Sequence, residues 1–404
     1  MTEIIIDISE FLASPIRTGI QRVVRELVAN WPSSTPAIFA RYDTGYDVLV
    51  EVPRSVVDLA LDISANGVLT DADVSSWIQD ALAAAPHAPI AIGSRQILVP
   101  ELFYDKRRID FYHARLRDSG PAPHFIVYDF IPWLKPQTIG VRDSGYLMPY
   151  LLLLMSARRL AFISEAVRQE YIHRIMRGAL DDSAVGPAIP LGADGLKLPR
   201  QQYGPERKTL VCLGAFDGRK HQEIVLEAFL SLPKARRGRL VFMGRVSDRP
   251  PARLRPLLDY RGPDVDLIDH PSDARIGEAM SEALATLFVS TTEGFGLPAL
   301  ESLDAGVPVV LHRDLPSVTD IAEAGQIRLD VVDVGSVKRA LQTLLEPAEA
   351  RRLWDAAATQ RPQSWARYAA RIAEWVSSAP PVAAPRLENK SNKAWSRIIN
   401  KRGL

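Results

Sequence analysis

The chain has 404 residues, with 49 Lys and Arg against 48 Asp and Glu, and a formal net charge of +1. This length suits two or three domains, and the balanced charge argues against a nucleic-acid-binding protein, which normally carries a basic face. Hydrophobic residues make up 47% of the chain and charged residues 24%, which is ordinary for a globular protein and excludes a long disordered chain.

The single cysteine, Cys212, excludes an intrachain disulfide and lies in an apolar run, so we expect it in the core. The N-terminus shows neither the basic nor the apolar segment of a secretory signal peptide. The most apolar stretch, residues 146–157, is shorter than the ~20 residues that a membrane-spanning helix needs. We therefore expect a buried or interfacial helix there, and a cytoplasmic protein.

The first half of the chain alternates strands and helices. Residues 3–8 predict a buried strand, and residues 20–28 repeat apolar side chains at helical spacing after a glycine-containing loop. Residues 124–128 and 160–163 predict further strands, and Ser164 suits the N-cap of a following helix. Residues 178–208 are rich in Gly, Pro and charged residues, which predicts a linker.

A second alternating series follows this linker. Its predicted strands lie at residues 209–214, 239–244, 265–268, 285–290 and 307–311, and its predicted helices at 222–232 and 297–304. The pattern predicts an α/β fold with two Rossmann-like domains facing a cleft, where ligands bind at the carboxyl ends of the strands. We expect an N-terminal domain over residues 1–203, a C-terminal domain over 204–378, and a Pro/Ala linker with a basic tail over 379–404.

The segment 290–301 is the most informative for chemistry. Glu293 lies in the loop between a predicted strand and helix, and Gly294 and Gly296 flank Phe295, so backbone amides there can approach a ligand. The free amides at the start of the helix favour an anion, and Glu301 is placed to face the same cleft. Because two isolated glutamates usually mark only a capped helix with surface carboxylates, the surrounding residues decide the interpretation.

Those residues, Leu297-Pro298 and the small-Gly-x-Pro-Val strand at 305–310, resemble the signature of retaining GT-B glycosyltransferases (group 1, family 4-like). That family carries two glutamates separated by seven residues, and the resemblance covers about residues 1–375. It implies a GT-B architecture with a late helix that returns to the first domain. It also implies that Glu293 and the amides of residues 294–297 orient the transferred sugar, while Glu301 binds the ribose of the donor.

Three further segments fit the same family in the expected order. Thr18-Gly19 resembles the glycine loop, which implies that the Gly19 amide approaches the donor phosphate. Asp129 begins a segment similar to the Asp-x-Ile-Pro element of polysaccharide-building members, which implies a catalytic position. Arg219 and Lys220 resemble the cations that grip the donor diphosphate by fork-like and point-charge contacts.

The chain departs from the family at Tyr128, where related enzymes commonly carry a histidine that contacts the sugar. Tyrosine can hydrogen-bond there but cannot act as a base near neutral pH. His221 stands where asparagine is frequent and suits a helix N-cap or a surface position. The histidines show no metal-ligand spacing, and Asp71 and Asp73 open a predicted helix instead of following a strand. We therefore expect no metal ion and no cofactor beyond the donor substrate.

These observations predict a hexosyltransferase that moves a sugar from a nucleoside-diphosphate sugar, with GDP-mannose favoured, to a glycan or lipid-linked glycan in polysaccharide biosynthesis. The alternative is a non-catalytic GT-B scaffold that binds a glycan or a partner protein, which Tyr128 supports. A nicotinamide-dependent dehydrogenase lacks support because no Gly-x-Gly-x-x-Gly follows a strand. The tail, residues 387–404, has a net charge of +4 and suits either a solvated terminus or peripheral contact with an anionic membrane.

Overall fold

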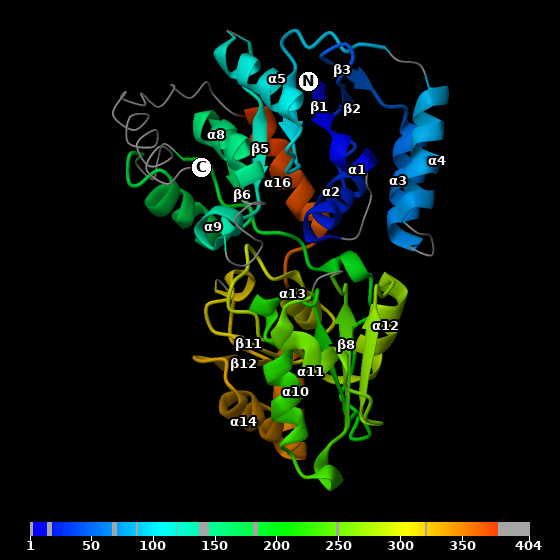
Figure 1. Ribbon diagram of the computed structural model, residues 1–404, viewed down its shortest axis with the longest axis vertical. Coiled ribbons are helices and arrows are strands. Elements are labelled where there is room, and N and C mark those ends of the chain that lie inside the picture. The colour runs from blue at the N-terminus through cyan, green and yellow to red at the C-terminus, as the bar shows by residue number, and fades with distance from the viewer. Residues whose placement is uncertain are drawn as a thin grey trace.

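The computed structural model describes residues 3–13, 18–66, 71–85, 88–118, 120–136, 145–180, 185–247, 250–319 and 321–378. Two α/β domains are stacked along the long axis of the molecule (Figure 1). The predicted linker and basic tail over 379–404 lie outside the described residues, as do residues 14–17 of the glycine-containing loop.

The first domain is built on a six-stranded sheet in the order β3-β2-β1-β4-β5-β6. Its strands are β1 (Ile4–Asp7), β2 (Ala37–Asp43), β3 (Val48–Glu51), β4 (Gln96–Val99), β5 (His124–Val127) and β6 (Arg159–Phe162). All neighbours pair in parallel except β2 and β3, which form an antiparallel hairpin. Its helices are α1 (Ser9–Ala13), α2 (Gly19–Ala29), α3 (Arg54–Asn66), α4 (Asp71–Ala84), α5 (Lys106–Arg117), α6 (Ile131–Leu134), α8 (Met148–Ser156) and α9 (Glu165–Glu170), which continues as the π-helical turn η2 (Tyr171–Ile175).

The second domain repeats this arrangement with six strands that are all parallel, in the order β12-β11-β10-β7-β8-β9. Its strands are β7 (Thr209–Leu213), β8 (Arg239–Gly244), β9 (Val265–Asp269), β10 (Ala283–Phe288), β11 (Val309–His312) and β12 (Gln326–Leu329). Its helices are α10 (Gln222–Leu230), α11 (Arg255–Leu258), α12 (Asp273–Glu282), α13 (Leu297–Asp304), α14 (Val334–Leu344) and α15 (Pro347–Ala357), and the last helix, α16 (Trp365–Ser378), follows them in sequence.

The topology of the second sheet defines where a ligand is expected to bind. The chain builds outward from β7 through β8 to β9, then returns to the other side of β7 and builds β10, β11 and β12. In doubly wound sheets the crevice at such a reversal, outside the carboxyl ends of the strands, is the usual binding site. The loops after β7 and β10 meet there, and these are the loops that carry the predicted cations and Glu293.

The apolar stretch at residues 146–157 forms α8, which buries Tyr150, Leu151, Leu153 and Leu154 in the first domain. A buried helix was the prediction for this stretch. In the part of the chain that the structure describes, no helix is both long enough and apolar enough to span a membrane.

Two chain segments, residues 192–194 and 363–365, run side by side between the domains. The Ala193 N–H donates to the Gln363 carbonyl at 2.9 Å, and the Asp194 carboxylate accepts the Trp365 N–H at 2.7 Å at the start of α16. A Cβ on Gly192 would lie 2.3 Å from the backbone nitrogen of Trp365, so only glycine allows this approach. The exact boundary between the domains stays a prediction.

Helix α16 then packs on the first domain, as the orange-red helix among blue and cyan elements in Figure 1 shows. Trp365, Tyr368 and Ile372 are fully buried there, and Trp375 packs edge-on against His124 with ring centroids 4.8 Å apart. The last helix in sequence therefore belongs to the core of the first domain.

We expect Trp365→Ala to lower the free energy of unfolding by about 3–5 kcal/mol, because truncating a buried aromatic side chain loses its burial and leaves a cavity. The midpoint of urea denaturation measures the change. Trp77→Ala is the matched control, since Trp77 is 50% exposed and its removal should change stability by only about 0.5 kcal/mol. Equal shifts for the two variants would contradict the packing role of α16.

Candidate active site

An ion cluster joins the loops that follow β7 and β10. The Lys220 ammonium donates to one carboxylate oxygen of Glu293, and the Arg219 guanidinium lies 3.4 Å from the other oxygen. The Glu293 side chain is only 10% exposed, so water screens these interactions weakly. The structure thus brings together three residues that the sequence singled out from positions more than 70 apart.

Local structure fixes the two cations. They lie on a single 3-10 turn, η5 (Gly218–Lys220), whose N-cap residue Asp217 accepts hydrogen bonds from the backbone N–H of Arg219 at 3.0 Å and from its Nε at 2.9 Å. The Arg219 carbonyl accepts the Thr291 N–H at 3.2 Å, and Arg219 also donates to the Thr292 carbonyl at 3.0 Å. The loop after β10 is therefore tied to this turn by its backbone as well as by Glu293.

His221 ends the turn in a left-handed conformation with a φ of 53° and starts α10. It occupies the N-cap position that the sequence predicted, but its side chain makes no capping hydrogen bond. Instead, its Nε2 lies 2.9 Å from Thr291 Oγ1. His221 thus adds another contact between the two loops.

The glycine-rich loop after Glu293 is pinned against the first domain. A Cβ on Gly294 would lie 2.2 Å from the carbonyl oxygen of Tyr128, and the Ser164 hydroxyl donates to the Gly294 carbonyl at 2.8 Å. Phe295 and Leu297 are buried within the core cluster of the first domain. Gly294 is therefore required by close contact between the domains.

Gly296 is required for a different reason. Its φ of +101° lies in the left-handed region that favours glycine, and a Cβ there would lie 2.7 Å from the Leu315 side chain. The Ser317 hydroxyl donates to the Gly296 carbonyl at 3.1 Å, so this conformation is held from the loop after β11. The backbone then enters α13 with Pro298 in the first turn, where its missing N–H is tolerated.

Asp129 reaches the same cluster from the end of β5. Its Oδ1 accepts the Ile131 N–H at 3.0 Å. Burial raises the pKa of Asp129 to about 6, the Arg219 charge opposes this rise, and the Glu293 and Glu170 carboxylates add to it. The Asp129 carboxyl therefore lies in the electrostatic field of the site contributed by the second domain.

Tyr128 is turned away from this site. Its hydroxyl donates to the Pro100 carbonyl at 2.6 Å, and its side chain is buried in the core of the first domain. Burial raises its pKa well above its ordinary value. A contact between the Tyr128 hydroxyl and a sugar therefore finds no support in the geometry, because the hydroxyl is already hydrogen-bonded in the core.

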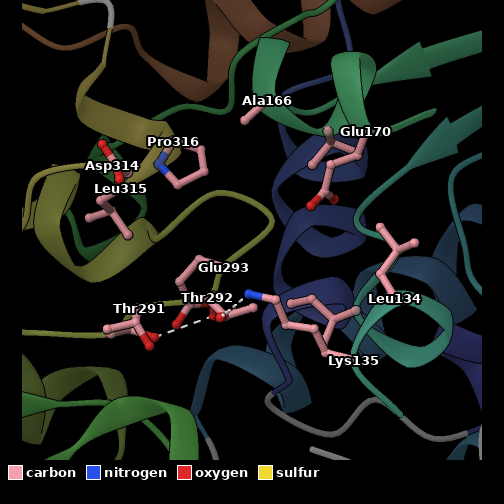
Figure 2. Close-up of a pocket in the computed structure, with 13 residues that line it drawn as sticks. Leu134, Lys135, Ala166, Glu170, Thr291, Thr292, Glu293, Asp314, Leu315 and Pro316 are labelled. Atoms are coloured by element: carbon pink, nitrogen blue, oxygen red, sulfur yellow. Dashed lines mark hydrogen bonds between the residues drawn. The ribbon is translucent and has the colours of Figure 1, made fainter. Parts of the chain in front are cut away.

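A pocket of about 150 Å³ opens beside Glu293 between the two domains. Figure 2 shows Lys135 extending across it, and the Lys135 ammonium donates to Thr292 Oγ1 at 2.6 Å. Its other polar lining includes Glu170 of the first domain and Asp314 of the second. Lys135 and Glu170 were not predicted as site residues, because single charged residues on or beside short helices carry no spacing signal. For Lys135, which caps the end of α6, the one available signal was its proximity to the Asp-x-Ile-Pro element.

Gly19 and Glu301 lie on the other helices that flank the domain boundary. Gly19 is the first residue of α2, Thr18 Oγ1 caps this helix by accepting the Gln21 N–H at 3.2 Å, and a Cβ on Gly19 would meet no atom within 4 Å. Glu301 is buried on α13 and forms an ion pair with Arg22 of α2 at 2.6 Å. Because a Cβ on Gly19 would meet no neighbouring atom, packing does not explain why a glycine begins α2.

Among the described residues, no group of three or more His, Cys, Asp or Glu side chains is arranged to hold a metal ion. Cys212 is buried in β7, and burial raises the pKa of its thiol to about 12, so it is an unreactive core residue, as predicted.

The raised pKa of Asp129 predicts a pH-dependent stability difference. Since its pKa rises from 3.8 to about 6 on folding, the folded chain retains a proton that the unfolded chain releases between these pH values. This contribution favours folding at pH 4 and is lost as the pH rises through 6. We therefore expect Asp129→Asn to match the wild type near pH 4 and to exceed its stability by about 1–3 kcal/mol at pH 7.

Thermal denaturation of both proteins between pH 4 and 8 measures this difference. In a Glu293→Gln background the stability difference at pH 7 should be smaller and should level off at a lower pH, since the Glu293 charge raises the pKa of Asp129 in the folded chain. A stability difference that does not change with pH would contradict the placement of Asp129 in this cluster.

Comparison with known proteins identifies the second domain. Residues 198–361 match the family model described as glycosyl transferases group 1. The serotype-specific mannosyltransferase WbdA of Escherichia coli is 24% identical to this chain over 359 residues, which cover 80% of this chain and 40% of WbdA. The chain thus spans about two fifths of the length of the curated relatives that it matches.

Solved structures resemble the whole chain in fold. Sucrose-phosphate synthase from Thermosynechococcus elongatus superimposes with a TM-score of 0.61 at 16% identity, with 94% of this chain and 99% of that one covered. HepE from Anabaena, in complex with UDP, also gives 0.61 at 14% identity, with 94% and 100% covered. WaaG, a glycosyltransferase of lipopolysaccharide biosynthesis, gives 0.52 at 14% identity, with 93% and 100% covered. These findings confirm the predicted fold, since the chain has the GT-B architecture, and they show that residues 198–361 resemble the predicted family, the glycosyl transferases group 1.

Proposed function

We propose that the chain is a retaining hexosyltransferase that moves a sugar from a nucleoside-diphosphate sugar to a glycan or lipid-linked glycan in polysaccharide biosynthesis. The observation that carries this proposal is the ion cluster of Glu293, Lys220 and Arg219 at the topological reversal of the second sheet. It places two cations and a carboxylate where a parallel sheet binds ligands, opposite Asp129 of the other domain.

The two cations suit a diphosphate leaving group. Arg219 offers a planar fork of N–H donors and Lys220 a point charge, and together they neutralise negative charge on phosphate oxygens. The bond from the anomeric carbon to the phosphate oxygen breaks as this charge develops, so fixed cations stabilise the transition state more than the ground state. The acceptor hydroxyl forms its bond to the same face of the anomeric carbon, and its proton passes to the departing phosphate oxygen.

The remaining residues orient the sugar. Glu293 and Asp129 accept hydrogen bonds from sugar hydroxyls, and the backbone amides around Gly294 and at the start of α13 add donors near the developing charge. The acceptor binds on the side of the first domain, where Lys135 and Glu170 line the pocket. Since two basic side chains supply the positive charge, we expect the transfer to need no metal ion.

GDP-mannose is the donor that we favour, supported by the similarity to the mannosyltransferase WbdA over 80% of this chain. UDP-sugars are the competing donors, since HepE, which shares the fold, was solved with UDP and with UDP-glucose. A cytoplasmic location and membrane contact through the basic tail stay predictions.

A panel of nucleotide sugars tests the proposal. The purified chain is incubated with each donor, with and without extracted glycan acceptor, and release of nucleoside diphosphate is followed. We expect release with GDP-mannose in the presence of the acceptor. The scaffold alternative predicts no release of nucleoside diphosphate with any donor. If, in addition, neither GDP nor UDP shifted the melting temperature, the proposed donor site itself would be refuted.

We expect Glu293→Gln and Lys220→Ala each to lower kcat by about 100-fold or more, because each removes a charged group that acts on the reacting sugar or the leaving group. Steady-state rates with the best donor measure this loss. Glu278→Gln and Lys234→Ala are the matched controls, since both residues are exposed outside the site, and both should retain the wild-type rate. A wild-type rate in either site variant would refute its role.

A further inference from the structure

A side chain of the first domain, that of Arg22, holds Glu301, the second glutamate of the two-glutamate motif. The guanidinium of Arg22 on α2 makes two contacts with Glu301 on α13: NH2 lies 2.6 Å from Oε1, and NH1 lies 3.3 Å from Oε2. The Glu301 side chain is 3% exposed and that of Arg22 is 17% exposed. Both oxygens of a buried carboxylate are therefore held from across the domain boundary.

The surroundings fix Arg22 in this position. The segment between the domains passes close by, since a Cβ on Gly195 would lie 3.2 Å from Arg22 NH2. One helical turn further along α2, Arg25 forms a second ion pair across the boundary, 3.0 Å from Asp273 of α12. This face of α2 thus contacts the second domain twice, but only Arg22 reaches a residue of the two-glutamate motif.

We propose that Arg22 is a positioning residue for the nucleotide: it orients the Glu301 carboxylate so that the remaining acceptor positions of this group bind the vicinal hydroxyls of the donor ribose. A carboxylate has about four acceptor positions, and the Arg22 guanidinium occupies at most one on each oxygen, by a hydrogen bond to Oε2 and an ion-pair contact with Oε1. The other two suffice for a ribose diol. This inference rests on the proposed function, because it assumes that Glu301 binds the ribose.

Charge makes the arrangement necessary. Burial raises the pKa of Glu301, and the Arg22 charge opposes that rise. The charged groups that face Glu301 are Arg22, Arg25 and Glu26 of α2 and Asp273 of α12. Without Arg22 the burial and the neighbouring carboxylates act against the charged form, so Glu301 takes up a proton more readily and accepts fewer hydrogen bonds.

Calorimetric titration with GDP and with UDP, together with donor kinetics, tests this proposal on the full chain. We expect Arg22→Met to raise the Kd of the better nucleotide and the donor KM by about tenfold or more, with a much smaller change in kcat. Arg22→Lys keeps the charge but loses the two-point geometry, so its Kd and KM should lie between those of the wild type and Arg22→Met. The affinity of Arg22→Met should also fall more steeply than that of the wild type from pH 8 to pH 6.

A double-mutant cycle separates positioning from other roles. If Arg22 acts through Glu301, Arg22→Met should add almost nothing to the Kd once Glu301→Gln is present. Asp273→Asn is the matched control: it breaks the other ion pair between the domains and should leave nucleotide affinity within about twofold of the wild type. Thermal melts identify any variant that fails to fold.

Five results would overturn the inference. Tighter binding by Arg22→Met would mean that the ion pair competes with the nucleotide, and an additive loss in the Glu301→Gln background would mean direct contact with the nucleotide. An equal loss in Asp273→Asn would mean that any bridge between the domains acts alike. A wild-type protein that binds neither GDP nor UDP would refute the proposed function together with this inference, whereas normal binding by both Arg22 variants would refute this inference alone.

Discussion

The carboxylate of Glu293, held between Lys220 and Arg219, is the interaction on which the geometry of the site depends. Lys220 and Arg219 lie in the loop after β7, the strand beside β10, so the ion cluster ties together the two loops at the reversal of the second sheet. An exposed ion pair contributes only about 0–1 kcal/mol. Here the side chains are 10–24% exposed, and removing one partner would leave partly buried charge without compensation.

The same loop is also fixed by the other domain, which couples the two halves of the molecule. Ser164 binds the Gly294 carbonyl, and the absence of a Cβ on Gly294 lets the loop lie directly against the Tyr128 carbonyl. A change in the angle between the domains would therefore break contacts of the loop that carries Glu293. On this geometry, separating the domains would also change the shape of the proposed sugar site.

Local pattern in the sequence was sufficient to predict much of the fold and the position of the motif loops. Strand β8 and helix α13 lie at the predicted residues, because apolar runs bounded by glycine, and proline in a first helical turn, are local signals. The hairpin of β2 and β3 and the strands β4 and β12 were not identified. Strands β3, β4 and β12 have only four residues each, and β3 and β12 are edge strands. In the longer β2, Arg41 interrupts the apolar residues.

Contacts between the domains could not be predicted by the same means. Arg22 and Glu301 are 279 residues apart, and Lys135 and Thr292 are 157 apart. Periodicity reports which face of one element is buried, whereas these pairs depend on how two separately built domains dock. Tyr128 illustrates the limit: its place after a strand was evident from sequence, but the direction of its side chain is set by the Pro100 carbonyl inside the first domain.

The two sheets share one strand order, yet their two reversals differ in the charges that they leave accessible. In the first domain the reversal lies between β1 and β4, and the protein's own side chains fill it. Arg108 pairs with Asp7, the last residue of β1, at 2.7 Å and with Glu101, which follows β4, at 2.8 Å, and all three side chains are at most 1% exposed. Glu101 also accepts the N–H groups of Glu10 and Phe11 at the start of α1.

An anion at that reversal would meet two carboxylates whose guanidinium partner is already used. In the second domain the corresponding cations, Arg219 and Lys220, lie on a loop that is only partly buried and share the Glu293 carboxylate, while Asp217 of the same turn also pairs with Arg219. Similar topology therefore yields different chemistry, because buried ion pairs close one crevice and leave the other accessible. This asymmetry supports the proposal that the diphosphate of the donor binds to the second domain, while Asp129, Lys135 and Arg22 contribute from the edge of the first domain.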